Sequence, residues 1–445
     1  MSAETSALLT DLYQLNMIQA YLDHGDTGTA VFELFCRTLP PRRGFLVAAG
    51  LQQALDYLEN LRFSADDIAW LRSTGRFRPN AIDYFSSLRF TGDVHAMLEG
   101  TIFFANEPVL RVTAPLPQAQ LVETRLINIL HFQSLVAAKA ARCMLAAPGK
   151  VLVDFGLRRA HGAEAGLMAA RASYLAGFAG TATVLAGEMF DIPLYGTMAH
   201  SFIEAFDDES LAFETYARAR PNNLVFLLDT YDTEAAARKV VALAPKLKTD
   251  GIIVRAVRLD SGDLIALSKS VRSILDQGGL RDVTIFASGG LDEDSLVTFA
   301  KANAPIDGIG IGTSLTTSAD VPNIDFVYKM QEYAGLPRRK KSDKKATWPG
   351  RKQVWRRYDA DGRMTGDLLG LENNRGDGEP LLQPVMKDGR RLEASPPIEQ
   401  ARQRVKRSLE CLPEPLQRLD TGTTYHVEVA AELKTLAAEV DRRMS

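Results

Sequence analysis

The feature that most constrains the fold is a unit that repeats from Val151 to Gly312: a short apolar run, a polar or glycine-rich end, and a helical stretch. The runs, of which Val151–Val153 and Ile192–Tyr195 come first, end at Asp154, Thr197, Asp229, Asp260, Ser288 and Gly310. Apolar strands alternating with helices are typical of a parallel sheet buried on both faces. Polar groups at all of these ends favour an irregular TIM-like (β/α) barrel. A doubly wound open sheet is the alternative, and it would gather its polar residues at one switch point.

The sequence on either side of the repeat has a different pattern. Residues 1–128 mix short strands and helices and are expected to form an N-terminal α/β, open sandwich-like domain. Residues 129–325 would form the barrel, and residues 326–445 a C-terminal α/β region that packs on the N-terminal domain. The apolar run Val327–Tyr333 is expected to close the barrel. A length of 445 residues fits two or three domains.

Composition excludes several classes of function. The formal net charge is only −3, so no overall field recruits nucleic acid or an anionic membrane. The 3 cysteines lie far apart and form no CxxC pair, which argues against a disulfide framework or a thiolate zinc site. The first thirty residues lack the basic start and apolar core of a signal peptide. We expect a cytoplasmic protein with no membrane partner.

Two glycine-rich segments follow consecutive strands of the repeat. Ser288, Gly289 and Gly290 precede a helix that is expected to start at Asp292. Gly308–Ser314 repeats the arrangement one unit later. Glycines let backbone N–H groups approach an anion, and a helix N-terminus favours negative charge. Two such loops on consecutive units are the usual arrangement for phosphate at the end of a barrel.

Two further clusters could carry chemistry. The segment Arg258–Asp263 places an arginine and carboxylates at one strand end, where they could grip an anion or a hydroxyl-rich sugar; a salt-bridged turn with a helix cap at Asp263 is the alternative. His200 follows an apolar run. A single histidine there is either a satisfied structural residue or a nucleophile, since neutral imidazole is competent near pH 7.

Several segments together carry a family resemblance: TDLYQLNM, DFGLRRAHG, AGTATVLAGE, GTMAHSF and VRLDSGDL. They resemble the matching segments of nicotinate phosphoribosyltransferases (type II phosphoribosyltransferases), which join nicotinic acid to phosphoribosyl pyrophosphate. The resemblance covers nearly the whole chain. It implies an ATP-stimulated ligase with glycosyltransferase chemistry in NAD salvage, with ATP as co-substrate and Mg²⁺ as cofactor. It also implies a homodimer with the active site at the interface.

The resemblance also implies roles for individual residues. His200 would be the catalytic phosphohistidine, and Asp260 would be catalytic, near the ribose and Mg²⁺. The nicotinate site would comprise Phe155, Thr197, Arg258 and, from the neighbouring subunit, Tyr13. The phosphoribosyl pyrophosphate site would comprise Arg158, Asp229, Ser288, Gly289, Gly290, Gly310, Gly312 and Thr313.

Substrate choice depends on Ala182 in the segment AGTATV. Relatives that use nicotinamide carry an aspartate at the matching position, and an aspartate would repel a carboxylate. Ala182 therefore favours nicotinate over the alternative, a nicotinamide phosphoribosyltransferase. A non-catalytic, ligand-sensing barrel is the alternative from a different class. The basic run at residues 338–345 fits either a solvated loop or a mobile flap that meets phosphates.

Overall fold

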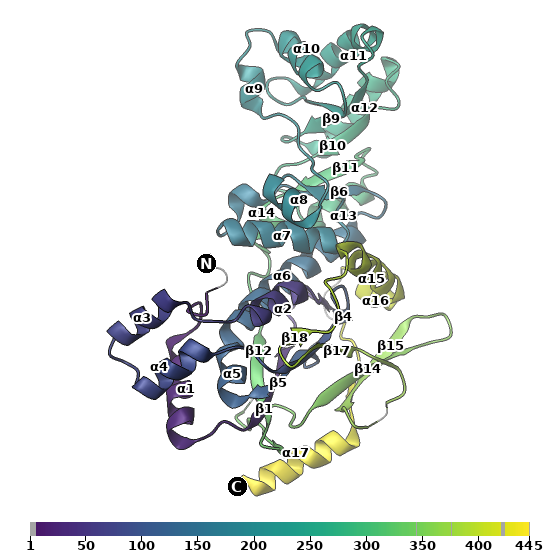
Figure 1. Ribbon diagram of the computed structural model, residues 1–445. Coiled ribbons are helices and arrows are strands. Elements are labelled where there is room, and N and C mark those ends of the chain that lie inside the picture. Colours follow the sequence, from purple (N-terminus) through teal and green to yellow (C-terminus); the bar gives the residue numbers. More distant parts are fainter. Residues whose placement is uncertain (1–5, 344, 375, 420–422, 445) are drawn as a thin grey trace. The chain divides into compact units, whose positions relative to one another are not determined.

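The computed structural model describes residues 6–343, 345–374, 376–419 and 423–444 (Figure 1). The chain divides into two compact units. Unit 1 combines Met1–Ala138 with Asn323–Ser445, and unit 2 is Lys139–Pro322. The long helix α6, Glu123–Ala146, contributes residues to both.

Unit 1 is built on a seven-stranded sheet with the order β13-β12-β1-β5-β3-β17-β18. Its strands are β1 (Thr29–Cys36), β3 (Asp93–Met97), β5 (Pro108–Pro115), β12 (Phe326–Tyr333), β13 (Leu336–Pro337), β17 (Leu382–Lys387) and β18 (Arg390–Arg391). Neighbouring strands pair antiparallel. Because β12 pairs with β1 and β17 with β3, strands from both ends of the chain share this sheet.

Smaller sheets and helices complete unit 1. A four-stranded sheet joins β14 (Lys352–Tyr358), β15 (Met364–Leu371), β16 (Glu379–Pro380) and β19 (Val427–Val429), and a two-stranded one joins β2 (Leu46–Val47) and β4 (Ile102–Phe103). The helices are α1 (Leu12–His24), α2 (Leu51–Glu59), α3 (Ala65–Ser73), α4 (Pro79–Ser87), α5 (Leu116–Leu121), α15 (Ile398–Cys411), α16 (Glu414–Gln417) and α17 (Ala431–Arg443).

The prediction that Val327–Tyr333 closes the barrel is wrong. This run forms β12, which pairs antiparallel with β1 in unit 1. Tyr328 of β12 stacks on Phe32 of β1 with ring centroids 4.8 Å apart, and its hydroxyl donates to the Ala119 carbonyl at 2.8 Å. β12 therefore pairs along both edges within unit 1, with β1 and with β13.

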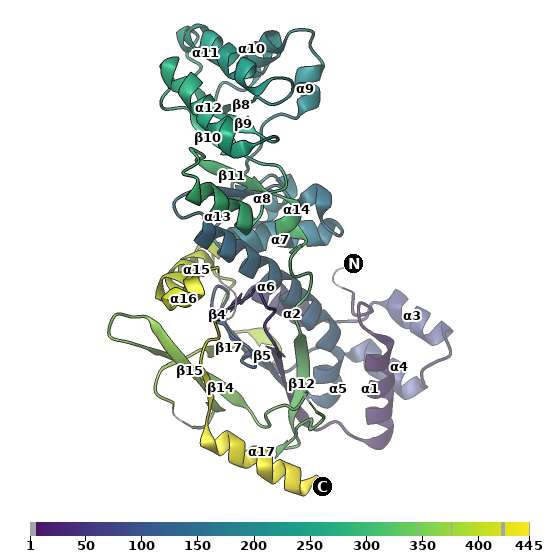
Figure 2. The ribbon, with the colours of Figure 1, turned by 180° about the vertical axis from the view of Figure 1, so that it is seen from behind.

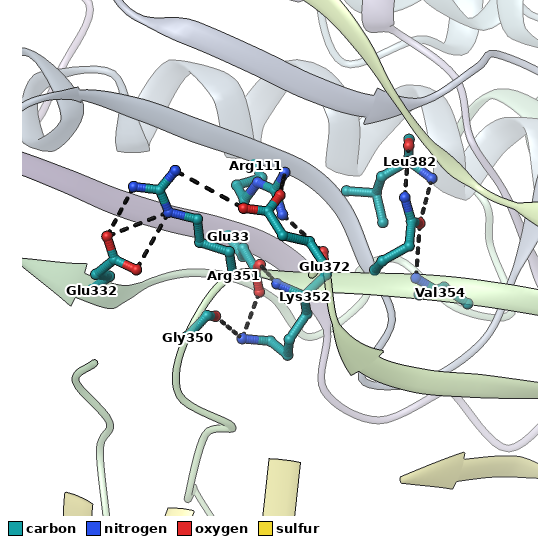
Figure 3. A network of polar contacts seen from close by, with 10 residues as sticks. Glu33, Arg111, Glu332, Gly350, Arg351, Lys352, Val354, Glu372 and Leu382 are labelled. Carbon is teal, nitrogen blue, oxygen red and sulfur yellow. Dashed lines mark hydrogen bonds and ion pairs between the residues drawn. The ribbon is translucent and has the colours of Figure 1, made fainter. Parts of the chain in front are cut away.

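Buried ion pairs connect the strands of unit 1 (Figure 3). The Lys352 ammonium lies 2.7 Å from the Glu33 carboxylate, and both side chains are buried. Arg111 pairs with Glu372 and also donates to the Lys352 carbonyl at 2.9 Å. Burying charges costs free energy unless they are paired, so these contacts hold particular strands together.

Unit 2 contains a six-stranded parallel sheet with the order β7-β6-β11-β10-β9-β8. The strands are β6 (Val151–Asp154), β7 (Gly180–Thr181), β8 (Leu224–Leu227), β9 (Val254–Leu259), β10 (Thr284–Ala287) and β11 (Gly308–Ile311). The helices are α7 (Ala163–Leu175), α8 (Val184–Phe190), α9 (His200–Glu204), α10 (Glu209–Ala219), α11 (Thr233–Thr249), α12 (Leu264–Gln277), α13 (Glu293–Lys301) and α14 (Thr313–Thr316). Helices α10, α11 and α12 lie next to one another (Figures 1 and 2).

The parallel α/β architecture agrees with the sequence prediction, but a closed barrel is not confirmed. The strand order is that of a barrel opened between β7 and β8, and these two edge strands do not pair within the described residues. The expected strand Ile192–Tyr195 contributes only one bridge, between Thr181 and Leu194. Pro193 lacks an N–H to extend that ladder. We refer to the opening between β7 and β8 as the seam.

Among the described residues, no helix combines the length and the apolar character that crossing a membrane requires.

Candidate active site at the strand ends of unit 2

Arg258, near the end of β9, is the centre of the polar cluster in unit 2. Its Nη1 donates to the Thr197 hydroxyl at 2.7 Å and to the Met198 carbonyl at 3.3 Å. Its Nη2 donates to Oδ1 of Asp260 at 3.2 Å. The guanidinium therefore ties the segment before α9 to the end of β9.

Asp260 joins Arg258 to the strand end of β10. Its Oδ1 also accepts a hydrogen bond from the Ser288 hydroxyl. Burial alone would raise the pKa of the Asp260 carboxyl, but the Ser288 hydrogen bond and the Arg258 charge, with a smaller contribution from His200, lower it below its ordinary value. Asp260 is therefore an anion at neutral pH.

His200 is the first residue of α9, and it is half-buried. Its Nδ1 lies 3.1 Å from the hydroxyl oxygen of Thr230, which follows β8. Because the Thr197–His200 segment follows the β7 edge, this contact and the Arg258 contacts span the seam. Side chains, rather than a strand ladder, hold the two edges together there.

Two polar atoms in this cluster are buried without a hydrogen-bond partner among the described residues: Oδ1 of Asp229 and Nε of Arg258. The other Asp229 oxygen accepts from the Ser261 hydroxyl at 2.5 Å. Buried polar groups are nearly always paired in folded proteins. An unpaired acceptor and an unpaired donor at neighbouring strand ends are therefore typical of a ligand site.

Phe155 follows β6 and packs between the ends of several strands. Its ring centroid lies 6.0 Å from that of Phe286 and 6.0 Å from the Arg258 guanidinium carbon. A Cβ at Gly310 would come within 2.4 Å of the Phe155 ring. Glycine at position 310 therefore gives the ring its place on β11.

The two glycine-rich segments have different structures. Gly289 and Gly290 have φ of +101° and +67° and are exposed, and Asp292 caps α13 by accepting from the Ser295 N–H at 2.9 Å. Gly310 instead lies inside β11, and Gly312 is the N-cap of α14. The first segment thus has an open backbone before a helix, as predicted, whereas the second is mostly strand.

Four predicted residues are exposed on the loops around this cluster, without a hydrogen bond or ion pair to it among the described residues. Arg158 follows β6, Ala182 follows β7, Gly290 follows β10 and Thr313 begins α14 after β11. Ala182 donates its N–H to the Asp154 carbonyl at 2.9 Å. The Asp154 side chain is buried, and burial raises its pKa although hydrogen bonds from Thr181 and Gly156 partly offset this.

Tyr13 lies in unit 1, as the second residue of α1, and is 46% exposed. Partial burial raises the pKa of its phenol, and the Glu123 and Asp11 carboxylates add to this effect. Leu9 and Leu12 next to it are also exposed. Its predicted stacking on the ring bound by a neighbouring subunit stays a prediction.

The matches to known proteins extend over nearly the whole chain. Residues 8–131 match the nicotinate phosphoribosyltransferase (NAPRTase) N-terminal domain, residues 151–344 the NAPRTase family model, and residues 375–437 the C-terminal domain. A nicotinate phosphoribosyltransferase of Mycobacterium tuberculosis (pncB2) is 47% identical over 426 residues, covering 95% of this chain and 91% of that protein. The chain belongs to the nicotinate phosphoribosyltransferase family. The sequence-based recognition is thereby confirmed.

Further known proteins are similar to this chain in sequence or in fold. The Bacillus subtilis enzyme is 40% identical over 404 residues, covering 89% of this chain and 80% of that protein. The crystal structure of human nicotinic acid phosphoribosyltransferase superposes with a TM-score of 0.86 at 29% identity, covering 97% of this chain and 99% of that one. A nicotinate-nucleotide pyrophosphorylase from Pyrococcus furiosus superposes with a TM-score of 0.75 at 25% identity, covering 92% and 96%.

Sequence reasoning assigned no role to three residues that contact the predicted site of this family member. Thr230 contacts His200, Ser261 donates to Asp229, and Phe286 packs beside Phe155. Thr230 and Ser261 each directly follow an aspartate at a predicted strand end. Their position next to these aspartates was the sequence signal that could have identified Thr230 and Ser261. Phe286 lies inside a strand, and its sequence context gave no such signal.

The described residues contain no group of three or more histidine, cysteine or acidic side chains that could hold a metal ion. Mg²⁺ needs less from a protein, because it keeps several waters and is commonly bound by one or two carboxylates together with substrate phosphates. The unpaired Oδ1 of Asp229 and the ionised Asp260 fit that requirement.

Several contacts tie the basic run at residues 338–345 to the rest of unit 1. Arg339 and Lys341 lie 3.6 and 3.7 Å from the Asp441 carboxylate of α17, and Arg339 also lies over the Trp348 ring. Lys344 is outside the described residues. These contacts favour the loop interpretation over a free flap.

Proposed function

We propose that the chain is an ATP-stimulated nicotinate phosphoribosyltransferase that makes nicotinate mononucleotide and pyrophosphate for NAD salvage. The observation that carries this proposal is the cluster in which Arg258 contacts Thr197 and Asp260 while His200 lies beside them, at the strand ends of a family member. The pyridine nitrogen attacks C1 of phosphoribosyl pyrophosphate through an oxocarbenium-like transition state, and pyrophosphate leaves.

Arg258 and Phe155 would hold the nicotinate. The unpaired Nε–H of Arg258 is a charge-assisted donor for the carboxylate, and Thr197 fixes the guanidinium from the other side. Phe155 offers its ring to the pyridine, a contact worth roughly 1 kcal/mol beyond area burial. Ala182 adds no negative charge near this position.

The exposed backbone of Gly289 and Gly290 would bind phosphate oxygens of phosphoribosyl pyrophosphate, with Arg158, Gly312 and Thr313 on neighbouring loops. Asp229 would accept a ribose hydroxyl at its unpaired Oδ1. Asp260, with Asp229, would hold Mg²⁺ jointly with the diphosphate. The ion neutralises charge on the leaving group when it is bound.

His200 would receive the phosphoryl group of ATP, which couples ATP hydrolysis to an otherwise reversible transfer. Its half-buried position beside Asp260 supports this role, because the ring remains accessible and has an anion nearby.

We propose a homodimer in which the site is completed by the partner. Exposed apolar side chains gather around α8, beside Ala182: Val184, Leu185, Met189, Leu194 and Tyr195. Leu194 packs on Gly187 of α8, so the segment after this helix lies against it. Exposed apolar patches of this kind mark protein interfaces. Tyr13, which is exposed next to Leu9 and Leu12, would come from the second copy.

The test is to incubate the full chain with phosphoribosyl pyrophosphate and Mg²⁺, with or without ATP, and with nicotinate or nicotinamide in turn, and to measure mononucleotide. We expect product from nicotinate, and faster product with ATP. His200→Asn should abolish ATP hydrolysis and the ATP stimulation while a slow basal reaction persists. His24→Asn, on the exposed end of α1, is the matched control. Unchanged ATP stimulation in His200→Asn would remove His200 from the mechanism.

A further inference from the structure

The strand order places a hydrogen-bonding partner for His200 on the far side of the seam. Nδ1 of His200 lies 3.1 Å from the Thr230 hydroxyl oxygen, and Nε2 has no hydrogen-bond partner within the part of the chain that the structure describes. Thr230 is half-buried and directly follows Asp229 after β8. Nδ1 of His200 is thus held by Thr230, whereas Nε2 is left for a ligand.

We propose that Thr230 is a positioning residue that selects the tautomer of His200, so that Nε2 is the nucleophile. A neutral imidazole has one protonated and one unprotonated nitrogen. A proton on Nδ1 that is donated to the Thr230 oxygen leaves the lone pair on Nε2, the nitrogen without a protein partner. This inference rests on the proposed function for the identity of the electrophile, but not for the tautomer.

The bond changes in the proposed step balance. The Nε2 lone pair forms a bond to the γ-phosphorus of ATP, the bond between that phosphorus and the β–γ bridging oxygen breaks, and ADP leaves with the bond's electron pair. The ring becomes cationic, and its Nδ1 proton stays in the hydrogen bond to Thr230. The hydroxyl oxygen therefore gains an interaction with a charged donor in the transition state, where it is most valuable.

The structure of the seam explains why a side chain, and not a strand ladder, must orient the His200 imidazole. The Thr197–His200 segment follows an edge that makes only one bridge, so no strand ladder fixes the ring at the seam. Arg258 fixes the segment through Thr197 and Met198, and Thr230 fixes the ring itself. The two contacts have separate tasks, orienting the backbone and orienting the imidazole.

The experiment reads the tautomer directly in the full-length protein. Ring-¹⁵N-labelled histidine is introduced, the His200 signals are assigned by comparison with His200→Asn, and the protonated nitrogen is identified by ¹H–¹⁵N correlation at a pH where the ring is neutral. We expect Nδ1–H in the wild type and in Thr230→Ser, and a shift toward Nε2–H in Thr230→Val. Thr249→Val, at the far end of α11, is the matched control and should resemble the wild type.

A second readout follows the nitrogen that is phosphorylated. With ATP, ³¹P NMR should show phosphate on Nε2, and Thr230→Val should form it about tenfold more slowly, the effect of one lost hydrogen bond. Nε2–H in the wild type, or the same tautomer in Thr230→Val as in the wild type, overturns the proposal. If no phosphohistidine forms at all, the proposed function fails, while the tautomer measurement still decides the role of Thr230. The wild-type measurement decides it even if Thr230→Val does not fold.

Discussion

The two units of the chain use arginine–carboxylate pairs in opposite ways. In unit 1, the Arg356 and Asp367 side chains are 1% and 0% exposed and lie on paired strands β14 and β15. In unit 2, the Arg258 and Asp260 side chains are 14% and 27% exposed and lie where β9 ends. One pair is inside a sheet, and the other is at its edge.

The two arginines differ in how many of their guanidinium nitrogens donate a hydrogen bond. Nε, Nη1 and Nη2 of Arg356 all donate, to Asp367 and to the Ile102 carbonyl, and its guanidinium lies over the Phe104 ring. Arg258 keeps Nε without a partner in the described residues. A saturated pair stabilises strands, whereas a pair with spare donors is suited to bind a ligand. We therefore expect the two arginines to affect different measurements.

The largest expected effect is on the stability of unit 1. Arg356→Met should lower the free energy of unfolding by about 3–5 kcal/mol, because Asp367 would remain buried without its cation. Urea denaturation measures this. Arg357→Met, on the same strand but with a 30% exposed side chain, is the matched control and should cost about 0–1 kcal/mol.

A partner substitution checks the cause. Replacing Asp367 by Leu together with Arg356→Met removes the buried, unpaired carboxylate and should recover much of the lost free energy of unfolding. If Arg356→Met is no more destabilising than Arg357→Met, the saturated pair does not stabilise the sheet, and the contrast between the units is wrong.

The next effect is on catalysis in unit 2. Arg258→Met should lower kcat/KM for nicotinate about 100-fold, the size expected for a lost charge-assisted contact to the substrate, while the free energy of unfolding falls by about 1–2 kcal/mol, less than in Arg356→Met. Arg255→Met, an exposed arginine on the same strand, is the control and should leave both quantities unchanged. A large loss of stability with little loss of activity would make Arg258 a structural residue like Arg356.

Sequence patterns predicted the parts of this molecule that depend on local chemistry. The apolar runs of unit 2 formed a parallel sheet. Asp292 became a helix cap as predicted, and so did Asp263, for which a cap had been the alternative, because a carboxylate can accept from the N–H groups two or three residues later. The partner of β12 could not be predicted, since an apolar strand fits several sheets and the choice of β1 depends on packing such as that of Tyr328 on Phe32.

The candidate site shows the same division. Strand-end residues such as Asp260 were found because the ends of parallel strands share an edge of the sheet. Thr230 was missed, because its contact with His200 exists only through the geometry of the seam. Gly310 leaves space for the Phe155 ring. In the sequence, such a glycine cannot be distinguished from one that leaves space for a phosphate.

The smallest expected effect comes from adding a charge at the sheet edge instead of removing one. Ala182→Asp should shift the ratio of kcat/KM values from nicotinate toward nicotinamide by about tenfold, since the new carboxylate repels the acid and accepts from the amide. Because residue 182 is exposed and keeps its N–H bond to Asp154, the free energy of unfolding should hardly change. Ala182→Asn has the same size without the charge and should leave the ratio near that of the wild type. Equal shifts in both variants would assign specificity to the shape of the pocket, whereas no shift in either would place the choice of pyridine at Arg258 and Thr197 alone.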